Sequence, residues 1–138
     1  MASAGQEIHG ASGFVLRLVR VEPDVLEMEA SYSGTSAIPP EHLHPKQAER
    51  FEVLEGSVTT IIAGAEKRFG AGEVFEVPVG TPHQMGAQEP TRLRWEVRPA
   101  LRTAEFFERM YGDGPDSARA MGADFLAEFS DEFQLSAA

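Results

Sequence analysis

The sequence predicts an all-β fold, a small sandwich or barrel, with helices at its C-terminal end. Short runs rich in Val, Ile, Leu and Phe recur up to Pro99, and glycine or proline turn signals separate them. Two of these runs, 25–33 and 91–98, alternate apolar and polar residues, as strands with one buried face do. After Pro99 the apolar spacing becomes helical. Many short strands at even spacing argue against a parallel βαβ fold.

The barrel is expected over residues 13–100, after a loose N-terminal arm of small and polar residues at 1–12. Gly56 lies between two apolar runs, as the turn of a hairpin would, and the prolines at 39 and 40 interrupt pairing just before a histidine-rich segment. In chain order the expected strands are 14–20, 25–33, 51–54, 58–62, 73–77 and 91–98.

Residues 101–138 are expected to form a helical extension. Thr103 is a suitable N-cap for a first helix over 104–111. A second helix is expected over 117–133, where apolar residues recur every four positions: Met121, Phe125 and Phe129. We expect the apolar stripes of both helices to pack on the outer wall of the barrel, with a lid over its mouth or a dimer contact as alternatives.

Composition excludes several classes of function. The apolar content of 42% and charged content of 25% are those of an ordinary globular domain, here of 138 residues. The net charge of −10 argues against a nucleic-acid partner, because phosphates require a basic surface. We expect no membrane span, because no apolar run is long enough. The absence of cysteine excludes thiolate chemistry and fits a cytoplasmic protein.

Three of the four histidines fall in two short segments that together indicate a metal site. His42 and His44 are two residues apart, so on an extended chain they point to the same face. Glu49 can add an oxygen ligand, and His83 can complete the site from a distant strand. Imidazole and carboxylate together suit one divalent transition metal ion, namely Fe, Mn, Ni, Zn, Co or Cu.

Both segments resemble the two signature motifs of the cupin superfamily, G-x5-H-x-H-x3,4-E-x6-G and G-x5-P-x-G-x2-H-x3-N. The first is matched from His42 through Glu49 to Gly56, and the second from Gly72 through Pro78 and Gly80 to His83. The chain departs from the pattern at Ser36, in place of the first glycine, and at Ala87, in place of the final asparagine. Neither position is a metal ligand in the family. The resemblance implies a small double-sheet jelly-roll barrel with a single cupin domain.

The resemblance also implies that His42, His44, Glu49 and His83 are the metal ligands. In the alternative, Glu49 leaves the metal and acts as a catalytic base. Alternation places Phe51 and Val53 on the face of Glu49, which predicts a mostly apolar cavity beside the ion. The expected substrate contacts are Tyr32, Phe51, Val53, Phe75, Gln84, Met85, Leu93 and Trp95. Trp95 fits the core of the barrel better than a substrate contact.

Cupins perform many reactions, so three functions stay open. We expect a metal-dependent enzyme that acts on a small, mostly apolar or aromatic molecule, with an oxygenase or oxidase as the first hypothesis. A non-redox polyketide cyclase or isomerase, with the metal as Lewis acid, is the second. A non-enzymatic cupin that binds a small ligand is the third. Exposed edge strands and the N-terminal arm favour a homodimer.

Overall fold

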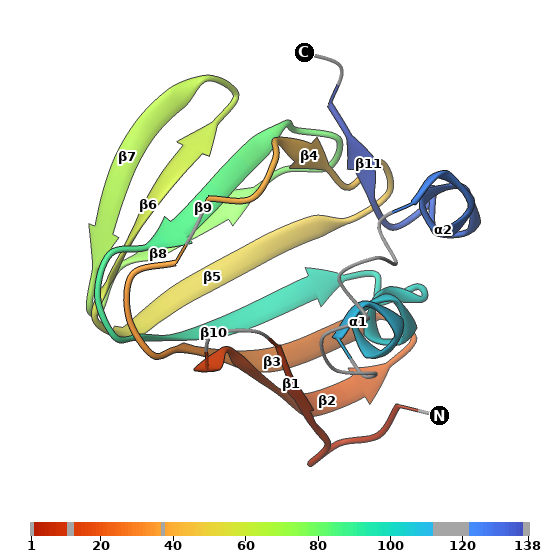
Figure 1. The fold of residues 1–138 in the computed structure, drawn as a ribbon, viewed down its shortest axis with the longest axis horizontal. Helices are drawn as coiled ribbons and strands as arrows, with labels where there is room; N and C mark the ends of the chain where they lie inside the picture. The colour runs from red at the N-terminus through yellow and green to blue at the C-terminus, as the bar shows by residue number, and fades with distance from the viewer. Residues whose placement is uncertain (1, 11–12, 37, 112–121, 137–138) are drawn as a thin grey trace.

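The computed structural model consists of two antiparallel β-sheets that face each other, with two short helices at one end (Figure 1). It describes residues 2–10, 13–36, 38–111 and 122–136. The predicted all-β class with C-terminal helices is thus confirmed. Within these residues no helix has the length and apolar character that a membrane crossing requires.

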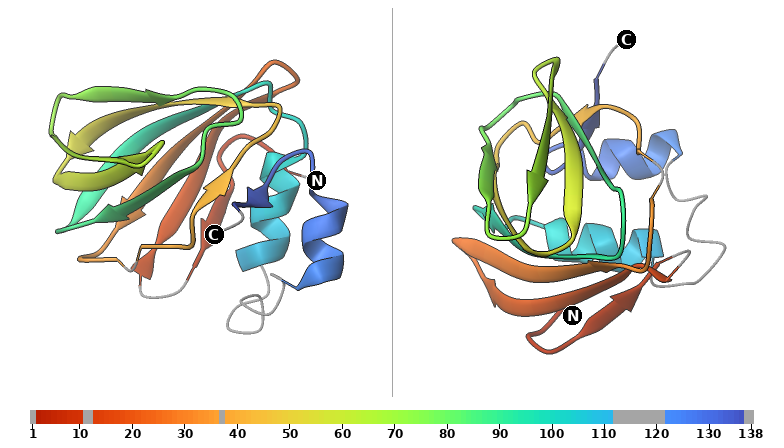
Figure 2. Two further views of the ribbon diagram at one scale, coloured as in Figure 1. Left: turned by 90° about the horizontal axis from the view of Figure 1, so that it is seen from above. Right: turned by 90° about the vertical axis from the view of Figure 1, so that its left-hand side faces the viewer.

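Strands that are far apart in the sequence become neighbours in both sheets. The six-stranded sheet has the order β1 (Glu7–His9), β2 (Val15–Glu22), β3 (Val25–Tyr32), β10 (Thr91–Arg98), β5 (Ala48–Glu55), β8 (Val74–Val77). The five-stranded sheet has the order β11 (Gln134–Leu135), β4 (His42–Leu43), β9 (His83–Ala87), β6 (Ser57–Ile62), β7 (Ala65–Gly70). The view down the barrel in Figure 2 shows the two sheets enclosing a common interior.

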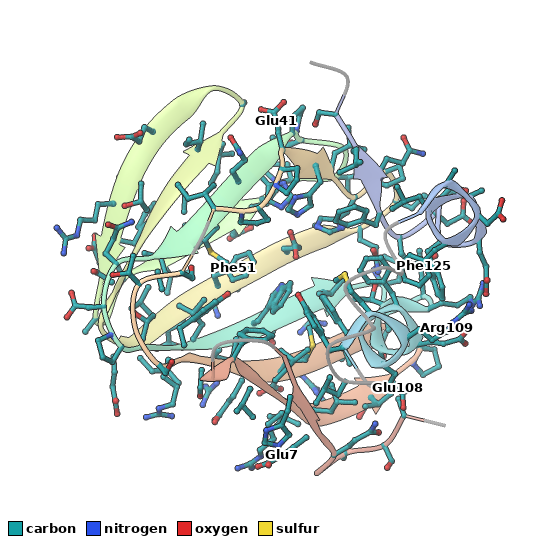
Figure 3. All side chains as sticks on the ribbon, viewed as in Figure 1. Glu7, Glu41, Phe51, Glu108, Arg109 and Phe125 are labelled. Carbon is teal, nitrogen blue, oxygen red and sulfur yellow. The ribbon has the colours of Figure 1, made fainter. Side chains whose placement is uncertain are left out.

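The inward faces of the sheets form the core, as the predicted alternation requires. On β3, Leu26, Met28 and Ala30 are fully buried, and the intervening glutamates are more exposed. In register with them across β10 lie Val97, Trp95 and Leu93. Phe51 on β5 points into the space between the sheets, whereas Glu7, Glu41 and Arg109 point outward (Figure 3).

The N-terminal arm, which was expected to be loose over residues 1–12, contains a short strand. Residues 7–9 form β1, whose central residue Ile8 is paired with Leu16 and is only 4% exposed. One apolar side chain among polar ones is a weak signal, yet its burial against the core is enough to add an edge strand. β7 was also unpredicted, because its outer edge is polar and most of its residues are exposed.

The C-terminal extension is less helical than expected. Helix α1 (Thr103–Tyr111) begins at Thr103 itself, and the N–H of Phe106 donates to the carbonyl of Arg102, so Arg102 rather than Thr103 holds the N-cap position. The hydroxyl of Thr103 accepts a hydrogen bond from Gln47 at 2.7 Å. Helix α2 (Ala123–Glu128) ends well before residue 133, and β11 follows it. The chain turns after Glu128, and residues 134–135 then pair with β4. The expected start at 117, with Met121, lies outside the described residues.

Gly56 gives a sharp test of the turn between β5 and β6. Its φ is +83°, and a Cβ there would lie 2.3 Å from the carbonyl oxygen of Pro90. We expect Gly56→Ala to lower the free energy of unfolding by about 2–4 kcal/mol, because left-handed backbone strain and steric overlap act together.

The matched control is Gly64→Ala in the turn between β6 and β7. Gly64 has nearly the same φ, +82°, but a Cβ added there would meet no atom within 4 Å, so only the backbone strain of about 1–2 kcal/mol applies. Urea unfolding of both variants measures the difference. Equal losses of stability would show that the Pro90 overlap carries no cost.

Candidate metal centre

Three histidines converge on one point of the barrel interior. His42 on β4 is paired directly with His83 on β9, and His44 follows β4 immediately. One ring nitrogen from each of the three lies within 4.8 Å of the others. His44 and His83 are buried and His42 is half-buried. The two motif segments therefore meet in space, as the metal-site prediction requires, because β4 and β9 are neighbours in the five-stranded sheet.

A backbone carbonyl fixes the orientation of each imidazole ring. Since a carbonyl oxygen can only accept, each Nδ1 carries the hydrogen, so Nε2 is the nitrogen whose lone pair is free when the ring is neutral. Metal-binding histidines are commonly held in this way. The three Nδ1 contacts are His42 to Pro40 O at 3.0 Å, His44 to Glu132 O at 2.7 Å, and His83 to Thr81 O at 2.9 Å.

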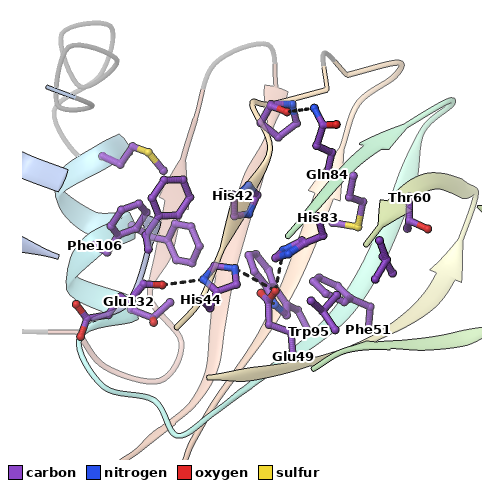
Figure 4. Close-up of a pocket in the computed structure, with 18 of the residues that line it drawn as sticks. His42, His44, Glu49, Phe51, Thr60, His83, Gln84, Trp95, Phe106 and Glu132 are labelled. Atoms are coloured by element: carbon purple, nitrogen blue, oxygen red, sulfur yellow. Dashed lines mark hydrogen bonds and ion pairs between the residues drawn. The ribbon is translucent and has the colours of Figure 1, made fainter. Parts of the chain in front are cut away.

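Glu49 reaches the cluster from β5 of the opposite sheet, as Figure 4 shows. Its Oε1 lies 3.1 Å from Nε2 of His44 and 3.1 Å from Nε2 of His83. Its Oε2 accepts a hydrogen bond of 2.8 Å from the indole N–H of Trp95. The carboxylate is 3% exposed and is therefore held in place on both sides.

The cluster leaves buried polar atoms without a well-aligned partner. Among the described residues, Nε2 of His44 and Oε1 of Glu49 have ion-pair contact but no hydrogen bond. An unsatisfied buried nitrogen and oxygen that face each other are costly in a protein interior. Coordination of one divalent ion would satisfy both. The donor set of imidazole nitrogens and one carboxylate therefore fits a first-row transition metal, although it does not fix which one.

Electrostatics keep two of the side chains in ligand form. Burial alone would raise the pKa of Glu49, but the adjacent His44 and His83 hold it well below its usual range. Burial, together with the neighbouring His83, lowers the pKa of His42 to about 4. Burial would lower the pKa of His44, but the Glu49 carboxylate outweighs it and raises that pKa. At neutral pH Glu49 is thus anionic and His42 is neutral.

The cluster opens onto a mostly apolar cavity of about 150 Å³. Of the expected substrate contacts, Val53 and Leu93 do not line it, because they face each other across β5 and β10 and are fully buried in the core. Whether the others touch a substrate stays a prediction. The expected contacts that do line the cavity are Tyr32, Phe51, Phe75, Gln84, Met85 and Trp95.

Helix α1 forms part of the cavity wall, so the expectation that its apolar stripe packs on the outer wall of the barrel is wrong. The helices lie across one end of the barrel (Figure 2). The apolar side of α1 lines the cavity with Phe106, Phe107, Met110 and Tyr111. Phe133 follows α2 and stacks on the ring of His42, with centroids 4.8 Å apart and planes 20° apart. Helix α1 and the segment at Glu132 and Phe133 thus cover the site.

A family model described as the cupin domain matches residues 32–97. That region contains every residue of the histidine–glutamate cluster and both motifs. The chain therefore contains a cupin domain. Its two facing antiparallel sheets are the cupin jelly roll, and the helices are an addition at one end of it. No curated protein matches this cupin in sequence.

Solved structures of other proteins share the fold at low sequence identity. KdgF from Halomonas sp. is 19% identical, over 75% of this chain and 99% of that one, with a TM-score of 0.66. An RmlC-like cupin from Shewanella frigidimarina is 19% identical, over 72% and 88%, with a TM-score of 0.64. Pac13 from Streptomyces, a nucleoside dehydratase, is 16% identical, over 72% and 79%, with a TM-score of 0.59. At these identities the likeness establishes the fold.

Sequence reasoning missed three parts of this cupin's site: the indole N–H of Trp95, the carbonyl of Glu132 and the ring of Phe133. Trp95 lies next to Glu49 only because β10 pairs with β5, with Val97 opposite Glu49. No local pattern reports which strands pair. The two C-terminal residues follow a helix that was expected to run through them. The cluster of aromatic residues from 125 to 133 was the one available signal.

Trp95→Phe isolates the hydrogen bond to Glu49 in this cupin. The new ring keeps the stacking position on Phe51, where the centroids are 5.2 Å apart, but loses the N–H donor. We expect metal affinity to fall about 10–100-fold, since partners that orient a ligand contribute about that much. Competition with a chromophoric chelator measures the change. Phe75→Leu, which alters an aromatic lining residue without that hydrogen bond, is the control, and equal affinities of both variants would contradict the prediction.

Proposed function

We propose that this cupin is a metal-dependent enzyme that acts on a small, mostly apolar or aromatic organic molecule, with oxygenase or oxidase chemistry as the first candidate. One observation carries the proposal. Three carbonyl-bound histidines converge beside an apolar cavity, and two of them, His44 and His83, face Oε1 of Glu49, which has no well-aligned hydrogen bond among the described residues. A site built only for stability would have satisfied these atoms within the protein.

The side chains divide the work by position. His42, His44 and His83 would hold a divalent metal ion, and Glu49 would hold it from the opposite sheet. When bound, such an ion acts as a Lewis acid, and a redox-active one also allows reaction with dioxygen. The aromatic side chains of α1 exclude water from the cavity, which strengthens every electrostatic interaction inside it.

The size of the cavity limits the substrate. A closed apolar cavity of roughly 150 Å³ accommodates benzene, and the cavity of this cupin has about that volume. The stacked rings of Phe51, Phe75 and Trp95 line it and provide flat apolar walls. A compound with a single ring therefore fits the space better than a fused polycyclic compound does.

A non-redox reaction, such as an isomerisation, cyclisation or dehydration, is the second candidate. The observation that favours it is the position of Glu49, a buried carboxylate beside the cavity whose Oε1 has ion-pair contacts to His44 and His83 but no well-aligned hydrogen bond among the described residues. Such a carboxylate can exchange a proton with a substrate through the neighbouring imidazoles. The likeness in fold to Pac13, named a nucleoside dehydratase, is consistent with this chemistry. A cupin that binds its ligand without turnover is the third candidate.

Metal content, followed by oxygen consumption, tests the proposal. The protein is purified without chelator or metal-affinity tag, and its metals are measured by elemental analysis. Near one equivalent of iron, copper, nickel or manganese, with dioxygen uptake on a single-ring phenol or enol, supports the oxygenase. Turnover without dioxygen uptake supports the non-redox enzyme. Absence of bound metal after reconstitution would refute both.

A further inference from the structure

The cavity contains polar side chains outside the metal centre, and most already have protein partners. The hydroxyl of Thr60 donates to the carbonyl of Lys67, and the amide of Gln84 donates to the carbonyl of Pro39. The hydroxyl of Thr103 accepts from Gln47. Two lining hydroxyls are different: those of Tyr32 and Tyr111 have no hydrogen-bond partner within the described part of the chain.

The two tyrosines line the same cavity and lie near each other, although they come from different elements. Tyr32 is the last residue of β3, and Tyr111 is the last residue of α1. Both rings contact Phe14, with centroid distances of 5.1 Å for Tyr32 and 5.5 Å for Tyr111. This aromatic group brings the jelly roll and helix α1 together, and the two phenol groups are near enough that Tyr111 raises the pKa of Tyr32.

Both hydroxyls are hydrogen-bond donors at neutral pH. Burial, with Tyr111 and Glu49 nearby, raises the pKa of Tyr32 far above its usual value, and burial also raises the pKa of Tyr111. Both residues line the cavity and are half-buried, so a ligand in the cavity can reach their hydroxyls. A ligand that covers a phenolic O–H removes its water, and this loss is costly unless an oxygen of the ligand replaces the water. Two tyrosines in place of phenylalanines therefore favour a ligand with a polar group on this side.

We propose that Tyr32 and Tyr111 bind an oxygen substituent of the substrate, a hydroxyl or carbonyl group separate from the group that faces the histidines. The inference rests on the proposed function and makes it more specific. The substrate class becomes a single-ring compound with two polar groups. One polar group is directed to the metal centre and the other to the tyrosine pair, with the apolar ring between the aromatic walls.

A pair of simple ligands tests the assignment. Benzoate and 4-hydroxybenzoate share a carboxylate for the metal and differ only in the distal hydroxyl. Their affinities are measured by calorimetry on nickel-loaded protein, since nickel suits the donor set and need not support turnover. We expect the wild type to bind 4-hydroxybenzoate about three- to tenfold more tightly, the usual effect of one or two neutral hydrogen bonds.

Three variants of the tyrosine pair and one control locate the effect. Tyr32→Phe and Tyr111→Phe should each reduce the preference, and the double variant should abolish it, while nickel content stays at the wild-type level. Thr60→Val removes a lining hydroxyl that already has a protein partner and should keep the preference. Nickel-loaded wild type that binds both ligands equally, or neither at millimolar concentration, would overturn the inference. Failure to bind nickel at all would instead refute the metal centre, and the proposed function with it.

Discussion

Replacing His83 with alanine should remove most of the bound metal and leave the jelly roll folded. The substitution deletes one of the three nitrogens that lie within 4.8 Å of one another. It also deletes a 3.1 Å contact to Oε1 of Glu49. Loss of a direct ligand should lower affinity by more than the roughly 10–100-fold that loss of a supporting partner causes. His44→Ala should behave in the same way, because His44 makes the equivalent contact.

His9→Ala is the matched control for the histidine substitutions. His9 is the one histidine outside the cluster, and its side chain is 66% exposed beside Glu7. Elemental analysis should find wild-type metal content in His9→Ala and little metal in His83→Ala, while circular dichroism shows the same β-rich spectrum for both. Full metal occupancy in His83→Ala would mean that the metal lies elsewhere.

Phe129→Ala should cost about 3–5 kcal/mol of stability, the range for deletion of a fully buried aromatic ring. Phe129 is 0% exposed. Its ring lies 5.0 Å from that of Phe125 and 5.5 Å from that of Phe106, and the guanidinium of Arg102 lies 4.5 Å from its centroid. The substitution therefore leaves a cavity where α1 meets α2. Urea unfolding measures the loss.

The same substitution should weaken metal binding at a distance. The turn after α2 is closed by the N–H of Glu132, which donates to the carbonyl of Phe129 at 2.9 Å. The carbonyl of Glu132 in turn orients His44. Leu135→Ala is the control, because Leu135 is 45% exposed in the same segment and should cost no more than about 0.5 kcal/mol. A Phe129→Ala variant that is as stable as Leu135→Ala would contradict the packing argument.

Local patterns in the sequence predict the strands and the histidine cluster well. The alternation over 25–33 predicts β3 (Val25–Tyr32) and its buried face. Period-two geometry places His42 and His44 on one face of the chain, and the resemblance to the cupin motifs adds His83, which the pairing of β4 with β9 brings to them. The role of Glu49 as a ligand stays a prediction, supported by its contacts to two of the histidines.

Features that depend on how elements pack could not be predicted in the same way. The spacing of Phe106 and Phe107 predicts that one side of α1 is buried. This spacing would be the same if that side packed on the outer wall of the barrel or lined the cavity, so it could not distinguish the two. The contact of Trp95 with Glu49 follows from strand pairing rather than from either residue's neighbours. Val53 and Leu93 have the correct alternation but lie where the core has no free space.

Trp95 is the single tryptophan of the chain, and its N–H is bound to Glu49. All tryptophan emission from this protein therefore comes from an indole that contacts a proposed metal ligand and also lines the cavity. The intrinsic fluorescence of Trp95 can therefore report on binding at the site. Titration with a paramagnetic ion or an aromatic ligand can be followed directly by fluorescence, without a label and without knowledge of the substrate.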